Sequence, residues 1–136
     1  LRSQLSNPSE HIILPEIISR EPLGPLVRHG DHEWGDIVRW SLNAMIIAEE
    51  LGLSSENIDS YFDSNNSEVL RLIGEEGNFG DMLELDYKWA YNIIKQVGDY
   101  GTIFNDNIGP NSALGLNRGL NALWTQGGIL YSPPFR

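Results

Sequence analysis

The chain has 136 residues, of which 40% are hydrophobic, enough for one compact domain and too few for two. Its formal net charge is −10, from 19 acidic and 9 basic residues, and such a surface repels the phosphates of nucleic acids and anionic membranes. No apolar run approaches the roughly 20 residues of a membrane span. Cysteine is absent, which excludes disulfides, thiol catalysis and thiolate metal sites.

Two short strands are predicted near the start of the chain. Residues 11–18 are apolar and β-branched, and Pro15 places such a strand at a sheet edge or a bulge. Residues 23–28 favour a second short strand, which Pro25 interrupts. A small strand pair is therefore expected before the first helix.

The polar residues between these strands are candidate hinge residues. Arg20 has the geometry to clamp a carboxylate through two parallel hydrogen bonds, or to pair with a neighbouring acid. Glu21 precedes Pro22, which pushes the chain into an extended conformation. We interpret Arg20 and Glu21 as a structural hinge rather than a ligand site.

A long helix is predicted from His32 to Leu51. Asp31 can cap its first turn, Glu33 suits the positive end of its dipole, and Gly52 ends it in the left-handed conformation. At helical spacing, one face carries Trp34, Ile37, Val38, Ser41, Met45, Ala48 and Leu51. This periodicity predicts that the face packs into the core.

Further helices are predicted downstream, over residues 54–62, 67–73, 81–85 and 116–124. Between the last two, Asp86 caps a second long helix whose apolar face extends from Tyr87 to Phe104. Gly98 and Gly101 each disfavour this helix by roughly 1 kcal/mol relative to alanine. They mark either a kink or a close approach of another element to the backbone.

Histidine and carboxylate side chains cluster around the start of the first long helix. His29 and His32 flank Asp31, and Glu33 follows, so the residue types suit a metal site. Because the spacing spans a strand-to-helix turn, the two rings need not converge. We interpret them as surface polar groups and expect neither a metal site nor another cofactor.

Two pairs of adjacent carboxylates occur, Glu49-Glu50 and Glu75-Glu76. Neighbouring helix positions point about 100° apart, which disfavours a shared proton. Catalysis by distant carboxylates stays open as an alternative, with Glu33, Glu49 and Glu75 as positions to test. The chain has no nucleophile elbow, phosphate loop or dinucleotide fingerprint. We assign no catalytic residue and expect no enzymatic activity.

The aromatic residues admit two interpretations. Four tryptophans and five tyrosines would suit a sugar or amino-acid pocket, but at helical spacing such residues more often fill the core. Trp34, Trp89 and Tyr91 are therefore assigned to core packing. Trp124 and Tyr131 lie in an irregular tail, and the sequence does not place them.

Two long blocks are rich in Trp, Gly and Pro and together cover most of the chain. They are LPEIISREPLGPLVRHGDHEWGDIVRW, residues 14–40, and DYKWAYNIIKQVGDYGTIFNDNIGPNSALGLNRGLNALWTQGGILYSPPFR, residues 86–136. Both resemble the C-terminal part of the substrate-binding proteins of bacterial amino-acid ABC transporters, in the general L-amino-acid branch of solute-binding family 3.

This resemblance implies an α+β, mostly helical chain, the C-terminal portion of a type II periplasmic binding protein fold with a small strand pair and a helical extension. Proteins of this fold have two lobes, and hinge closure traps the ligand between them. Residues 1–22 would end the second lobe and form the return crossover. Residues 23–53 would form a first-lobe strand and helix, and residues 54–136 the C-terminal helical extension of that lobe.

The resemblance also implies that the parent protein binds polar L-amino acids with broad specificity in the periplasm and delivers them to an ABC permease. The arginine and aspartate that grip the ligand in this family would precede residue 1, so no substrate-binding residue is assigned here. Strands without partners expose their edges, so self-association of the isolated chain is expected. The alternatives are a hydrolase domain using distant carboxylates and a helical interaction module that needs a partner chain.

Overall fold

The computed structural model describes residues 4–16, 18–19 and 23–135. Its α-helices are α1 (His32–Leu51), α2 (Ser67–Ile73), α3 (Trp89–Val97) and α4 (Tyr100–Asn107).

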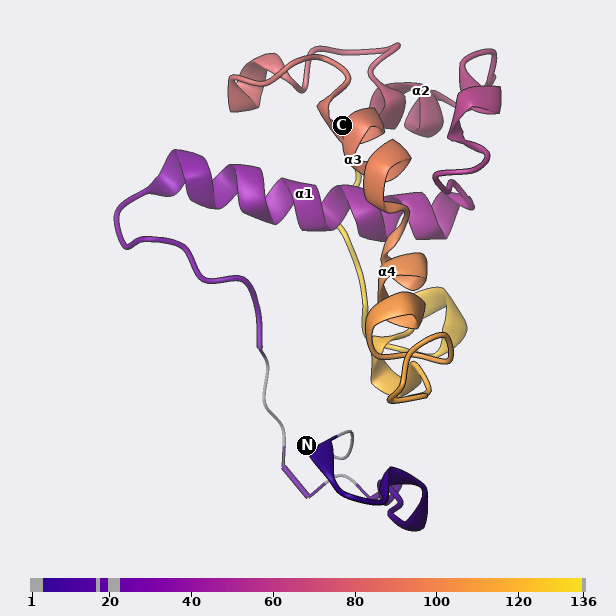
Figure 1. The fold of residues 1–136 in the computed structure, drawn as a ribbon. Helices are drawn as coiled ribbons and strands as arrows, with labels where there is room; N and C mark the ends of the chain where they lie inside the picture. Colours follow the sequence, from indigo (N-terminus) through magenta and orange to yellow (C-terminus); the bar gives the residue numbers. More distant parts are fainter. Residues whose placement is uncertain (1–3, 17, 20–22, 136) are drawn as a thin grey trace.

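Helix α1 organises the molecule (Figure 1). It lies across the middle, with α2 and its neighbouring loops on one side and α4 with the loops after it on the other. Helix α3 crosses α1, and both α3 and α4 pack against it. The last residues then return past α1, so the C-terminus lies on the α2 side. A single long helix therefore contacts each of the three later α-helices.

The sequence signals at the ends of α1 are confirmed. The Oδ1 atom of Asp31 accepts a hydrogen bond from the Trp34 backbone N–H at 3.2 Å, which satisfies one free donor of the first turn. Gly52 ends the helix with φ 71°, in the left-handed region that favours glycine.

The predicted core face of α1 is only partly correct. Burial is concentrated in the second half of the helix, at Ala44, Ile46, Ile47 and Ala48. Trp34 is 53% exposed, so its assignment to the core is wrong. The reason is that α2, α3 and α4 lie over the second half of α1, whereas its first turns extend beyond them. Periodicity identifies an apolar face but not what covers it.

Helix α2 has the predicted bounds. Gly74 ends it with φ 84°, and a Cβ atom there would collide with the backbone carbonyl of Tyr87. Glycine therefore serves both the helix end and the close approach of the chain leading into α3. The other predicted short helices form single 3-10 turns within their predicted ranges, at Ile58–Tyr61, Asp81–Leu83 and Gly119–Asn121.

The predicted second long helix is broken into α3 and α4. Gly98 leaves the helical conformation with φ 82°, and Asp99 then caps α4 by accepting the Thr102 N–H at 3.1 Å and its hydroxyl at 2.7 Å. At Gly101, a Cβ atom would lie 2.9 Å from Nη1 of Arg118. Both predicted roles of glycine thus occur, a break at Gly98 and a close approach at Gly101.

The C-terminal segment completes the core through Phe135. This ring is 5% exposed and lies between the rings of Trp40, Phe79 and Trp89, with centroids 5.3, 5.5 and 5.9 Å away. Such tilted and edge-to-face contacts are the favoured geometries of aromatic pairs. The core assignment of Trp89 is confirmed. Tyr91 is partly buried and packs against the same cluster.

The predicted strand pair is not formed by the residues that the structure describes. Residues 11–16 and 23–28 lie outside any helix or sheet, and the only β-bridge in the described part joins Leu123 to Leu130. A strand requires a partner ladder, and neither segment has one there. Pro15 and Pro25 also remove backbone donors from any ladder.

An exposed polar contact ties the loop after α1 to α3. The Oδ2 atom of Asp59 accepts a hydrogen bond from Lys95 Nζ at 2.7 Å, and its Oδ1 atom accepts one from the Tyr91 hydroxyl at 2.8 Å. These two hydrogen bonds, led by that from Lys95, lower the pKa of the Asp59 carboxyl. The same contacts with Asp59 raise the pKa values of Tyr91 and Lys95.

Within the described residues, no helix has the length and apolar character needed to cross a membrane.

Phe135→Ala should destabilise the fold by about 3–5 kcal/mol, because it empties a buried aromatic site at the meeting point of three segments. Chemical denaturation followed by circular dichroism measures the change. Ile129→Ala is the matched control, since Ile129 lies on the same C-terminal segment but is 71% exposed. Equal effects of the two substitutions would contradict the role given to Phe135.

Candidate functional site

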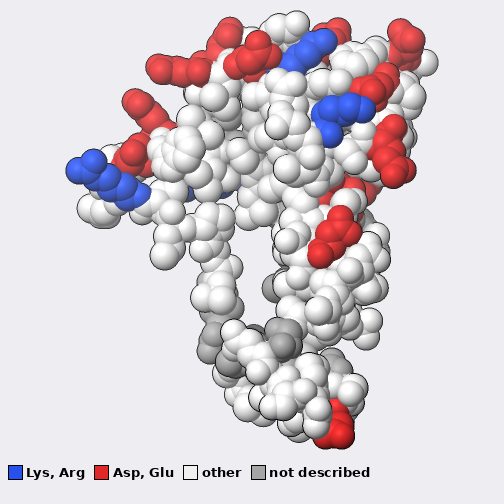
Figure 2. Space-filling model, in the orientation of Figure 1, with Lys and Arg blue, Asp and Glu red and all other residues white. Residues whose placement is uncertain are grey.

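The segment that precedes α1 is the most exposed apolar surface of the described chain. Ile18 and Leu26 are 97% and 98% exposed, and Ile12, Leu14 and Leu23 are also mostly exposed. Figure 2 shows acidic side chains spread over the upper part of this face, along α2, the neighbouring loops and the start of α1, whereas fewer charged side chains lie on the N-terminal segment below. Exposed apolar surface of this kind, with few charges, is typical of an interface.

The first half of α1 adds to this surface. A cleft of about 250 Å³ lies between the helix and the segment before it, lined by Pro25, Val27, Val38 and Leu42 among others. Trp34 is exposed one turn before Val38. We call residues 11–16, 18 and 23–27, together with Trp34 and Val38 of α1, the open surface. Its residues come from the strand predictions and from the unburied part of the predicted helix face.

The predicted hinge residues Arg20 and Glu21 lie outside the residues that the structure describes. Their neighbours on the described part of the segment, Ser19 and Leu23, are exposed. The hinge assignment therefore stays a prediction.

The carboxylates considered for catalysis are mostly held in ion pairs. Glu75 lies 3.4 Å from Lys88 Nζ, and Glu76 lies 2.9 Å from Arg71 Nη2. Glu33 is exposed in the first turn of α1. No pair of these carboxylates is held together around a shared proton, and each has a structural or solvated role of its own.

Glu49 forms the most enclosed ion pair of the described residues. Its Oε2 atom accepts a hydrogen bond from Arg118 Nη2 at 3.0 Å, and the two side chains are only 12% and 19% exposed. Arg118 also donates to the Asn121 carbonyl, and its guanidinium lies over the rings of Tyr100 and Phe104. This contact joins α1, α4 and the loop that follows α4.

Sequence reasoning missed the role of Arg118. One signal was available, since Arg118 is the only basic residue between Lys95 and Arg136. Its partner is 69 positions earlier, however, and nothing local to either residue indicates the pairing. Phe135 was missed for the same reason.

The histidines do not converge on a metal. His11 Nδ1 lies 2.9 Å from the Asn7 carbonyl oxygen, next to its own 3-10 turn. His29 and His32 line a shallow surface cleft to which Arg28 and Arg39 also contribute. No group of three potential ligands from His, Asp and Glu is found among the described residues.

The chain was compared with known proteins. No protein-family model matches the chain. YhdW of Escherichia coli K12, provisionally named as an amino-acid ABC transporter-binding protein, is 56% identical over 137 residues. The general L-amino acid-binding periplasmic protein AapJ of Rhizobium johnstonii is 54% identical over 138 residues. Each alignment covers 100% of this chain and 40% of the relative.

A solved structure agrees with these relatives. The ABC transporter periplasmic binding protein of Brucella ovis, with glutathione bound, superposes with a TM-score of 0.94 and 49% identity. The superposition covers 99% of this chain and 43% of that protein. The chain is a homologue of one part of an amino-acid ABC transporter binding protein.

The resemblance and the fold class predicted from the sequence are thereby confirmed, except for the strand pair, which the described residues do not form. The chain spans about 40% of the length of the curated relatives that it matches. Those relatives are named as binding proteins and not as enzymes.

Glu49→Gln should lower the free energy of unfolding by about 1–3 kcal/mol, because it leaves the enclosed Arg118 charge without its counter-ion. Glu50→Gln is the matched control. Glu50 is the next residue on α1 but is exposed, so its substitution should change stability little. Thermal and urea denaturation of the two variants measure the difference, and a smaller effect at Glu49 than at Glu50 would contradict this assignment.

The isolated chain of 136 residues should self-associate through the open surface. Sedimentation velocity over a range of concentrations should show species heavier than a monomer, and Leu26→Lys should reduce them. Ile129→Lys is a control at another exposed apolar residue, 71% exposed, on the C-terminal segment and outside the open surface. A monodisperse monomer at all concentrations would show that the open surface is not adhesive.

Proposed function

We propose that this chain is part of a periplasmic protein that captures L-amino acids and delivers them to an ABC permease, without catalysing a reaction. The observation that carries the proposal is the identity of 54–56% over the whole chain to relatives named for amino-acid binding. The superposition on a periplasmic binding protein supports the same function. Substrate class, permease and location are properties of the whole protein.

The division into lobes is part of this proposal. Residues 1–22 end one lobe and cross back, residues 23–53 supply a strand and helix of the other, and residues 54–136 extend that lobe. The open surface supports this division. Its exposed apolar side chains lie in the segment before α1 and in the first turns of α1, and both groups need a further surface to cover them. Arg20 and Glu21 are then hinge residues of the crossover.

The ligand is proposed to be a polar L-amino acid, recognised with broad specificity. A second candidate is a small peptide such as glutathione, which is bound in the Brucella protein. The γ-glutamyl end of glutathione carries a free α-ammonium and a free α-carboxylate, so it presents the same charged groups as a free amino acid. One site that grips these two charges would accept both ligands.

Isothermal titration calorimetry of the whole protein tests the function. L-glutamate, L-glutamine, L-arginine and glutathione are the ligands, and D-glutamate is the matched control for stereochemistry. Binding of several L-amino acids with much weaker binding of D-glutamate is expected. Tight binding of glutathione alone would favour the second candidate.

Absence of binding by every L-amino acid and by glutathione would overturn the proposal. The isolated chain of 136 residues is expected to bind none of them, because the residues that grip the ligand are predicted to lie outside it. An activity that is lost in Glu33→Gln or Glu75→Gln would instead support the hydrolase alternative. Fractionation of the cells that make the whole protein tests the periplasmic location.

A further inference from the structure

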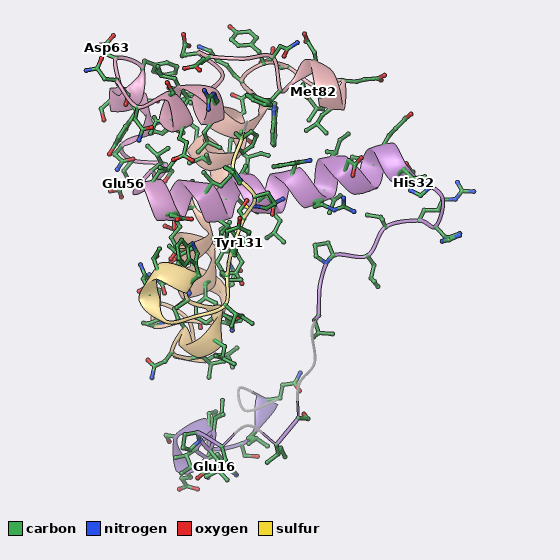
Figure 3. The ribbon with its side chains drawn as sticks, turned by 180° about the vertical axis from the view of Figure 1, so that it is seen from behind. Glu16, His32, Glu56, Asp63, Met82 and Tyr131 are labelled. Carbon is green, nitrogen blue, oxygen red and sulfur yellow. The ribbon has the colours of Figure 1, made fainter. Side chains whose placement is uncertain are left out.

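A cavity lies outside the open surface and its cleft. It has a volume of about 190 Å³ and lies between the second half of α1, the start of α2 and the C-terminal segment. Its lining combines the rings of Trp124 and Tyr131 with the carboxylates of Glu50 and Glu68. Figure 3 shows Tyr131 where the C-terminal segment passes α1. None of these residues has a role in the proposed amino-acid capture.

The two rings are presented by a well-anchored loop. The Trp124 N–H donates to the Leu130 carbonyl at 2.9 Å, and the Leu130 N–H donates to the Ala122 carbonyl at 3.1 Å. Leu123 and Ser132, the neighbours of the two aromatic residues, are 1% and 5% exposed. The backbone that carries the two rings is therefore held in place by hydrogen bonds and by buried neighbouring residues.

The rings themselves stay open to ligands. Trp124 and Tyr131 contact each other edge to face, with centroids 6.4 Å apart, yet they are 54% and 60% exposed. Exposed aromatic faces carry negative partial charge and attract cations.

The two carboxylates carry negative charge that the described residues do not neutralise. Glu50 is exposed and points away from its neighbour Glu49, which is paired with Arg118. Neither Glu50 nor Glu68 forms an ion pair with a described residue. The nearby cation of α2, Arg71, is already held by Glu76 at 2.9 Å and reaches the Phe135 carbonyl at 3.5 Å.

We propose that this cavity binds an organic cation, an alkylammonium or guanidinium group on an aliphatic stem. The carboxylates attract the charge, the rings of Trp124 and Tyr131 contact the cation by their faces, and Ile47, Leu51 and Pro134 cover the stem. The net charge of −10 raises the local concentration of cations. The cation is either a basic side chain of another protein or a free amine, and the two share this chemistry.

The proposal is tested by NMR titration of the ¹⁵N-labelled whole protein, following the indole N–H of Trp124. The probes are Nα-acetyl-lysine methylamide and Nα-acetyl-arginine methylamide, and Nα-acetyl-norleucine methylamide is the uncharged control of similar length. The two cationic probes should shift the Trp124 signal, and added salt should weaken them, because the contacts are exposed. An equal shift by the norleucine compound would overturn the proposal.

Substitutions locate the site. Glu50→Gln, Glu68→Gln and Trp124→Leu should each raise the dissociation constant roughly two- to five-fold. The matched controls are Glu33→Gln and Trp34→Leu, which should leave the dissociation constant unchanged. Trp34 is 53% exposed, like Trp124, and Glu33 lies about 25 Å from Glu50 along α1. Equal effects of the control and site substitutions would overturn the proposal.

A last comparison separates the two sources of the cation. 1-Butylguanidine presents the guanidinium of arginine on an aliphatic stem, with the same single charge and without a peptide backbone. Binding of 1-butylguanidine as tight as that of the capped arginine supports a free small cation, and tighter binding of the capped arginine supports a protein partner. No shift of Trp124 by any cationic probe would overturn the site itself. These outcomes are independent of whether the whole protein binds amino acids.

Discussion

The burial of Phe135 is the contact on which the rest of the helical body depends. It brings the end of the chain against Trp40 of α1, Phe79 of the loop after α2 and Trp89 of α3. Helices of seven to nine residues such as α2, α3 and α4 are marginal alone, and tertiary packing supplies most of their stability. The aromatic cluster around Phe135 provides that packing from three distant segments at once.

Charge has two distinct uses along one turn of α1. Glu49 is enclosed and fixes α4 and the following loop through Arg118, whereas Glu50 remains exposed beside the cavity with Trp124. The difference follows from the rotation of about 100° between neighbouring helix positions. The chain has 19 acidic residues and only 9 basic ones. An enclosed basic residue such as Arg118 therefore holds structural elements together, and most carboxylates remain at the surface.

The molecule divides into a body with its own core and a surface without a cover. The body contains α1 from Trp40 onward and the helices after it, and its apolar side chains contact one another. The open surface contains the segment before α1 and the exposed apolar residues of the first turns of that helix. The chain spans about 40% of the length of the curated relatives that it matches. An exposed apolar surface of this kind is expected of a chain that matches only part of a larger protein.

The sequence by itself determined the family resemblance and the ends of α1 and α2. Asp31 caps the start of α1, and Gly52 and Gly74 end α1 and α2. Each of these residues is adjacent to the helix end that it defines, so the local sequence is enough to predict it. Only the tertiary structure decided that Trp34 is exposed, that Glu49 pairs with Arg118, that Phe135 closes the core and that the predicted strands stay unpaired in the described residues. Each of these depends on contacts between residues far apart in the chain, or on a partner strand, and neither leaves a local pattern in the sequence.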